Sequence, residues 1–139
     1  MSDRCFVDTN ILIYAHDLSA GTKHQRASEL VEKLWAAGGG VLSTQVLQEF
    51  ANTVRRKPRR PLSLDDTLQV VRQYLQWQVV INTPTSVVSA LELEFRYRVS
   101  FWDALILCAA QVANVATLYT EDLSHGQVYG SVRAINPFR

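Results

Sequence analysis

Cys5-Phe6-Val7-Asp8-Thr9-Asn10-Ile11-Leu12-Ile13-Tyr14 is the stretch of sequence that decides the fold. Its first three residues are apolar and suit a short buried strand that ends at Asp8. Residues 11–14 are apolar again and indicate the start of a buried helix. A buried strand followed directly by a helix is typical of an α/β domain.

Outward from this stretch, short apolar strands alternate with helices. Apolar residues at helical spacing predict helices over residues 22–35, 44–55, 64–75, 84–95 and 100–114. Strands are predicted over residues 41–42, 79–81, 115–119 and 132–135, and a polar loop over residues 120–130. We therefore expect one α/β domain over residues 1–139, with a mostly parallel central sheet flanked by helices.

Two of these helices carry specific expectations about burial. The helix over residues 100–114 is apolar nearly all round, which predicts a central position in the core. The helix that begins at Pro84 is expected to bury its apolar face, formed by Val87, Val88, Leu91 and Phe95.

Composition excludes several classes of protein. The chain has 139 residues, of which 47% are hydrophobic and 19% charged, so it is neither disordered nor collagen-like. Its net charge of +1 excludes a uniformly basic nucleic-acid binder, and any such role must rest on a local site. Cys5 and Cys108 are expected to be free thiols, and we find no signal-peptide pattern or membrane-spanning run. We therefore expect a soluble, cytoplasmic protein.

Four acidic residues adjoin segments that should be core: Asp8, Glu49, Asp103 and Asp122. Asp8 and Asp122 each follow a predicted strand, and the carboxyl ends of parallel strands form the edge where ligands bind. Carboxylates that share a site raise each other's pKa and need a cation to stay ionised. Oxygen ligands suit Mg²⁺ or Mn²⁺, and such a site is suited to phosphodiester hydrolysis.

Each of these acids also has a purely structural interpretation. Asp8 would cap the helix that follows it, and Asp103 would complete a capping box with Ser100. Asp122 would be an ordinary loop acid, and Glu49 a solvated helix residue. Spacing alone leaves both interpretations open.

Four blocks of the sequence resemble those of the PIN-domain nucleases. Residues 7–14 resemble the opening motif of that family. Gln48-Glu49-Phe50, Phe101-Trp102-Asp103-Ala104-Leu105-Ile106 and Thr120-Glu121-Asp122 match its later blocks in order. The resemblance covers essentially the whole chain, whose length is similar to that of the VapC-type toxins of bacterial toxin–antitoxin pairs. It implies a three-layer PIN-like fold.

The resemblance also implies an activity and a set of site residues. It implies a Mg²⁺- or Mn²⁺-dependent endoribonuclease, usually a homodimer, that inhibits translation as a toxin and is neutralised by a cognate antitoxin. The implied catalytic acids are Asp8, Glu49, Asp103 and Asp122, with Asp8, Asp103 and Asp122 as metal ligands and Thr9, Asn10 and Thr120 as supporting residues. Glu121 adjoins Asp122 and is an alternative fourth acid, although the Thr-x-Asp pattern favours Asp122.

Two further features have both a functional and a structural interpretation. The basic run Arg55, Arg56, Lys57, Arg59 and Arg60 either binds RNA phosphates or forms a solvated loop. Trp102 either stacks on a base or packs in the core beside a buried helix start.

Three other functions remain open at this stage. One is a PIN-like RNA-processing nuclease outside a toxin–antitoxin pair. Another is an aspartyl phosphotransfer domain. The sequence disfavours it, because Asp8 is followed by Thr9-Asn10 rather than by a second acid. The third is a non-catalytic binding module, which the intact acids disfavour.

Overall fold

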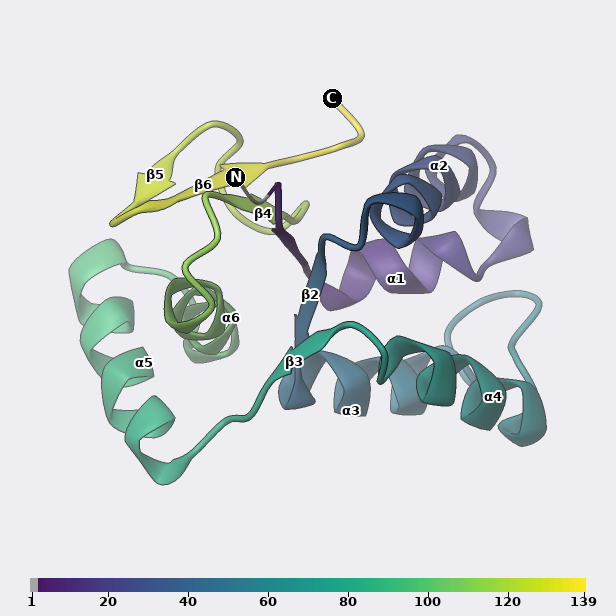
Figure 1. Cartoon of the computed structure of the whole chain (residues 1–139), viewed down its shortest axis with the longest axis horizontal. Helices are drawn as coiled ribbons and strands as arrows, with labels where there is room; N and C mark the ends of the chain where they lie inside the picture. The colour runs from purple at the N-terminus through teal and green to yellow at the C-terminus, as the bar shows by residue number, and fades with distance from the viewer. Residues whose placement is uncertain (1–2) are drawn as a thin grey trace.

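The central sheet places its strands in the order β3-β2-β1-β4-β6-β5 (Figure 1). The computed structural model describes residues 3–139, so residues 1 and 2 of the predicted domain lie outside the described range. The strands are β1 (Cys5–Val7), β2 (Gly40–Ser43), β3 (Gln78–Val80), β4 (Thr117–Tyr119), β5 (Val128–Tyr129) and β6 (Val132–Ile135). All neighbouring pairs are parallel except β5 and β6, which form an antiparallel hairpin.

The connections between strands explain where the helices lie. The helices are α1 (Thr9–Ala15), η1 (Leu18–Ala20), α2 (Thr22–Ala37), α3 (Thr44–Thr53), α4 (Leu64–Tyr74), α5 (Pro84–Tyr97) and α6 (Phe101–Val112). The chain moves outward from β1 to β2 to β3 and then returns across the sheet to β4. Because crossovers between parallel strands are right-handed, this reversal puts α1–α4 on one face and α5 and α6 on the other. The predicted α/β class, with a mostly parallel sheet between helical layers, is confirmed (Figure 1).

The reversal creates a crevice between β1 and β4, which are adjacent in the sheet. In open α/β sheets, ligands bind outside the carboxyl ends of the strands at such a switch point. Asp8 directly follows β1, and Thr120 directly follows β4. The topology therefore brings two of the predicted site segments together.

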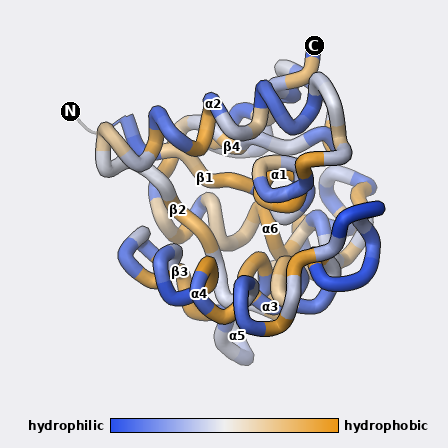
Figure 2. The backbone as a smooth tube through the Cα atoms, turned by 90° about the vertical axis from the view of Figure 1, so that its right-hand side faces the viewer, coloured by the Kyte–Doolittle hydropathy of each residue, from blue (hydrophilic) through white to orange (hydrophobic). Residues whose placement is uncertain are grey.

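The core fills the space on both sides of β1 and β2. Phe6, Val7, Val41 and Leu42 are fully buried, and Figure 2 shows these strands as hydrophobic segments in the middle of the molecule. All residues of α6 from Ala104 to Ala110 are buried, as its nearly continuous apolar sequence predicted. Among the helices of residues 3–139, none has the length and apolar character needed to cross a bilayer. The extent of the domain, residues 1–139, stays a prediction.

The predicted burial of the apolar face of α5 is wrong. Val87, Val88, Leu91 and Phe95 are exposed, and Phe95 retains 84% of its accessible surface. The reason is that α5 packs on α6 through another face, on which Ala90 is fully buried against Ala104 and Leu105. Helical periodicity correctly identified an apolar face on α5. It did not show that no other element of the described chain covers that face.

The predicted polar loop over residues 120–130 is also partly wrong, because Val128 and Tyr129 form β5. Tyr129 is buried, and Tyr97 of α5 packs edge-to-face against its ring with the ring centres 5.1 Å apart. A strand of two residues is too short for an alternating pattern, so its pairing with β6 left no signal in the sequence.

We predict that Gly40→Ala destabilises the protein. A Cβ at Gly40 would overlap the indole ring of Trp77, which is buried beside β2. Overpacking of this kind costs about 1–3 kcal/mol, measured as a loss in the free energy of unfolding in urea. Trp77→Leu should restore part of that loss in the double variant, and additive effects of the two changes would contradict the proposed overlap.

Candidate active site

Asp8 is a buried carboxylate at the junction of β1 and α1. It caps α1, and its Oδ1 accepts a hydrogen bond of 2.7 Å from the backbone N–H of Thr9. Its Oδ2 accepts a hydrogen bond of 2.7 Å from the hydroxyl of Thr120, at the end of β4. Only 5% of the residue is exposed. The capping role foreseen for Asp8 is therefore real, and it fixes the carboxylate at the switch point.

Asp122 is held beside Asp8 by two of the predicted supporting residues. The hydroxyl of Thr120 accepts a hydrogen bond of 3.1 Å from the backbone N–H of Asp122. The side-chain amide of Asn10 donates to Asp122 Oδ2 at 2.9 Å. Thr120 thus connects both acids, and Asn10 orients the second of them.

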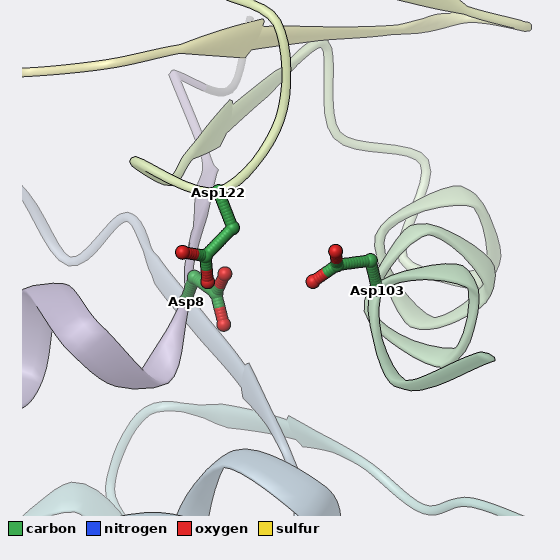
Figure 3. A group of neighbouring side chains, drawn as sticks. All are labelled: Asp8, Asp103 and Asp122. Carbon is green, nitrogen blue, oxygen red and sulfur yellow. The ribbon is translucent and has the colours of Figure 1, made fainter. Parts of the chain in front are cut away.

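Asp103 approaches from the opposite layer of helices. It lies in the first turn of α6, where the hydroxyl of Ser100 accepts a hydrogen bond of 3.1 Å from its backbone N–H. Its carboxylate points toward Asp8 and Asp122 (Figure 3). Each of the three acids offers an oxygen that lies within 4.8 Å of the others, so together they are able to hold a metal ion.

Glu49 stands next to this group without belonging to it. Its Oε1 accepts a hydrogen bond of 2.7 Å from the hydroxyl of Thr9. Gln45 and Thr53 lie one turn before and after Glu49 on α3, and all three line the same cleft. Sequence reasoning missed Gln45 and Thr53, although their spacing of four residues from Glu49 puts them on one helix face.

The four predicted acids line a single cleft of about 290 Å³, which we call the acidic cleft. Its lining residues are Asp8, Thr9, Asn10, Ile13, Gln45, Glu49, Thr53, Lys57, Trp102, Asp103, Ile106 and Asp122. Trp102 is 62% exposed here, so of its two interpretations the one that packs it in the core is wrong. Its helix begins at the rim of the cleft, and burial starts only with Ala104.

Burial raises the pKa values of all three clustered acids, and repulsion between carboxylates adds to the shift at Asp8 and Asp122. Burial raises the pKa of Asp8 to about 7, opposed by hydrogen bonds from Thr120 and Thr9 and reinforced by the charges of Asp122 and Asp103. Burial also raises the pKa of Asp103, and burial followed by the charge of Asp103 raises that of Asp122. A cation bound among them would replace the proton and relieve the repulsion.

Glu121 points away from the acidic cluster. Its carboxylate accepts hydrogen bonds from the hydroxyl of Tyr14 and the ammonium of Lys23, each at 2.8 Å. The ion pair with Lys23 therefore holds the Glu121 carboxylate away from Asp8, Asp103 and Asp122. Of the two adjacent acids, the geometry brings only Asp122 to the cluster.

The basic run divides into two groups. Arg55 and Arg56 turn back onto the end of α3, where they donate to the carbonyls of Ala51 and Asn52 at 2.9 and 2.6 Å. Lys57 lines the acidic cleft, and its charge lowers the pKa of Asp122. Arg59 and Arg60 line neighbouring hollows.

We predict that Asp8→Asn stabilises the metal-free protein at alkaline pH. The pKa of Asp8 is higher in the folded than in the unfolded state, so its contribution to stability falls as pH rises from about 4 to about 7. In the presence of a chelator, the variant should melt several degrees above the wild type at pH 8 and close to it at pH 4. Asp65→Asn, at an exposed position in α4, is the control. If the difference in melting temperature between the variant and the wild type is the same at every pH, the pKa of Asp8 is not raised by burial in the folded protein.

Comparisons with known proteins give the family. The model of the PIN domain matches residues 5–130. The toxin VapC20 of Mycobacterium tuberculosis, described as cleaving the sarcin–ricin loop, is 22% identical and aligns over 85% of this chain and 89% of its own, with a TM-score of 0.66.

A toxin–antitoxin complex from Klebsiella pneumoniae is similar in fold, with 19% identity over 96% of this chain and 97% of that one and a TM-score of 0.68. VapBC2 from Rickettsia felis, bound to a promoter DNA fragment, is 18% identical over 94% of this chain and 96% of its own, with a TM-score of 0.64. A search of curated proteins finds no significant match. The family match covers nearly the whole chain, including the acidic cleft, and the chain therefore belongs to the PIN-domain family of nucleases.

Proposed function

We propose that this protein is a Mg²⁺- or Mn²⁺-dependent endoribonuclease. The convergence of Asp8, Asp103 and Asp122 at the topological switch point of a PIN domain carries the proposal. Its donor set contains only carboxylate oxygens, which suits these cations rather than zinc. When bound, the cation would supply an activated water and stabilise charge on the attacked phosphate.

The chain's own residues would hold and orient this site. Asp8, Asp103 and Asp122 would be the metal ligands. Thr120 and Asn10 fix the carboxylates of Asp8 and Asp122 by hydrogen bonds, and Thr9 fixes Glu49. Such supporting contacts normally keep ligands in one orientation. In this proposal Glu49 is the fourth catalytic acid, which polarises a water at the edge of the cluster.

We also propose that the nuclease is the toxin of a toxin–antitoxin pair and acts on RNA in the cytoplasm. The support is the similarity in fold to VapC20 and to the toxin–antitoxin complexes. The cognate antitoxin would be its protein partner, and translation would be inhibited by cleavage of RNA.

A homodimer is part of the same proposal. The exposed apolar face of α5 supports it, because Leu91 and Phe95 expose 54% and 84% of their surfaces. Both residues line a hollow of about 640 Å³ whose other lining residues are also in α5, except for Gln111 of α6. Neighbouring exposed apolar side chains are typical of interaction sites on proteins.

We predict that the purified protein cuts RNA with Mg²⁺ or Mn²⁺ and that a chelator stops the reaction. Asp8→Asn, Asp103→Asn and Asp122→Asn should each lower the cleavage rate by at least about 100-fold, because each removes a charged ligand. Glu121→Gln is the matched control for Asp122, and it should cut at nearly the wild-type rate, since Glu121 is held by Tyr14 and Lys23. The rates are measured on a labelled RNA, with circular dichroism to verify folding.

Two results would contradict the site assignment. Cleavage that persists in Asp8→Asn and Asp103→Asn would show that the reaction occurs elsewhere. Equal losses in Glu121→Gln and Asp122→Asn would show that the orientation of these two acids differs from that in the structure.

For the toxin proposal, we predict that expression of the protein in bacteria arrests growth and the incorporation of labelled amino acids. Bacteria that express the Asp103→Asn variant at the same protein level should grow normally, because the acidic cleft of this variant lacks one of the three proposed metal ligands. If the wild type and the variant both arrest growth, toxicity does not depend on the acidic cleft and the toxin proposal for this site is wrong.

A further inference from the structure

Asp103 is held differently from the two acids that it faces (Figure 3). The carboxylates of Asp8 and Asp122 accept side-chain hydrogen bonds from the residue that follows β4 and from a residue of α1, respectively. Within residues 3–139, the only side chain that forms a hydrogen bond with Asp103 is Ser100, in the same helical turn. The position of Asp103 relative to the other two acids therefore depends on what holds the start of α6.

Gln45 connects the start of α6 to the opposite layer of helices. It is the second residue of α3, and its side-chain Nε2 donates to the backbone carbonyl of Trp102 at 3.2 Å. In the part of the chain that the structure describes, no other side-chain hydrogen bond joins α6 to the helices α1–α4. Trp102 directly precedes Asp103, so this bond acts on the backbone beside the acid.

Gln45 also lies beside the proposed fourth acid. Only 5% of Gln45 is exposed, and it lines the acidic cleft together with Glu49 and Asp103. Glu49 follows one turn later on the same face of α3. One face of α3 therefore carries Glu49 and also holds the helix that carries Asp103.

The other end of the Gln45 amide is a buried acceptor without a donor. Its Oε1 has no hydrogen-bond partner among the described residues. Turning the amide over would not supply one, because it would set the amide oxygen against the carbonyl oxygen of Trp102. An unpaired buried acceptor is unfavourable, and an apolar side chain of similar size would avoid it. Packing alone therefore favours an apolar residue here, and the contact that the amide adds is the bond to α6.

The bond is not needed to satisfy the Trp102 carbonyl. Trp102 lies in the first turn of α6, and carbonyls in a first turn accept from the N–H four residues further along the helix. Loss of the Gln45 amide would therefore leave no carbonyl unpaired. What the amide contributes is a fixed position of α6 relative to α3.

We propose that Gln45 is a positioning residue that holds the start of α6 against α3 and so keeps Asp103 within reach of a cation shared with Asp8 and Asp122. The inference rests on the proposed nuclease function and adds to it a residue that acts through Asp103 alone. Hydrogen bonds that orient metal ligands typically change metal affinity 10- to 100-fold.

The test replaces Gln45 with methionine, which has a similar size but cannot donate a hydrogen bond. In the presence of a chelator, Gln45→Met should unfold at the same urea concentration as the wild type or a higher one, because the unpaired acceptor is removed together with the bond. Amide hydrogen exchange should become faster over residues 101–107 and stay unchanged in α2. Gln48→Met, at an exposed position of the same helix, is the matched control and should change neither measurement.

The affinity for Mn²⁺, measured by isothermal titration calorimetry, is the second readout. Gln45→Met should bind Mn²⁺ about 10- to 100-fold more weakly than the wild type, and Gln48→Met should bind it equally well. In an Asp103→Asn background, Gln45→Met should have no further effect, because its action depends on the Asp103 carboxylate. Gln45→Leu is a second apolar variant for the same measurements in case Gln45→Met does not fold.

Four outcomes would overturn the proposal. The first is unchanged hydrogen exchange at the start of α6 in Gln45→Met, and the second is equal Mn²⁺ affinity of Gln45→Met and the wild type. The third is a full effect of Gln45→Met in the Asp103→Asn background. The fourth is a large loss of stability in both Gln45→Met and Gln45→Leu, which would give the amide a purely structural role.

Failure of the proposed function gives a different pattern. If the wild type binds Mn²⁺ but cuts no RNA, and Gln45→Met still shows faster exchange and weaker Mn²⁺ binding, Gln45 positions Asp103 at a metal site that is not that of a nuclease. If the wild type binds no Mn²⁺ at all, both the proposed function and the role of Gln45 are wrong.

Discussion

The buried carboxylate of Asp8 is the constraint on which the candidate site depends. Its two oxygens accept hydrogen bonds from Thr9, the first residue of α1, and from Thr120, which directly follows β4. Those bonds hold the carboxylate at the switch point, although burial and the nearby acids favour its neutral form. The fold thus maintains an arrangement that opposes ionisation in the absence of a cation. Such local instability is common where ligand binding, rather than folding, determines the geometry.

Three consecutive residues organise most of this arrangement. Asp8 contributes a carboxylate, Thr9 holds Glu49, and Asn10 holds Asp122. They fan out because the chain changes from a strand to a helix at Asp8, and side chains in the first turn of a helix point about 100° apart. One short segment therefore sets the positions of acids that are far away in the sequence. Asp103 is the exception, since α6 brings it from the other face of the sheet.

The sequence alone predicts these features to very different degrees. The strand ending at Asp8 and the central α6 were predictable because burial leaves continuous apolar runs. The exposed face of α5 was not, because periodicity identifies an apolar face but says nothing of whether a partner covers it. The approach of Asp103 to Asp8 was expected only from the family resemblance, since spacing carries no information about distance in space. The division of the basic run could not be predicted, because it depends on where α3 ends and which carbonyls are then free to accept hydrogen bonds from Arg55 and Arg56.

The near-zero net charge conceals a separation of charge between the acidic cleft and the neighbouring basic residues. In the proposed nuclease, the acidic cleft without a cation would repel the phosphates of RNA, whereas Lys57, Arg59 and Arg60 would attract them. Lys57 lies at the boundary and already lowers the pKa of Asp122, so the two regions interact electrostatically before any ligand arrives. Neutralising the carboxylates removes the repulsion at one end and leaves the attraction at the other. In the proposed nuclease, cation binding and RNA binding would therefore favour each other, because a cation in the acidic cleft cancels the charge that repels the RNA phosphates.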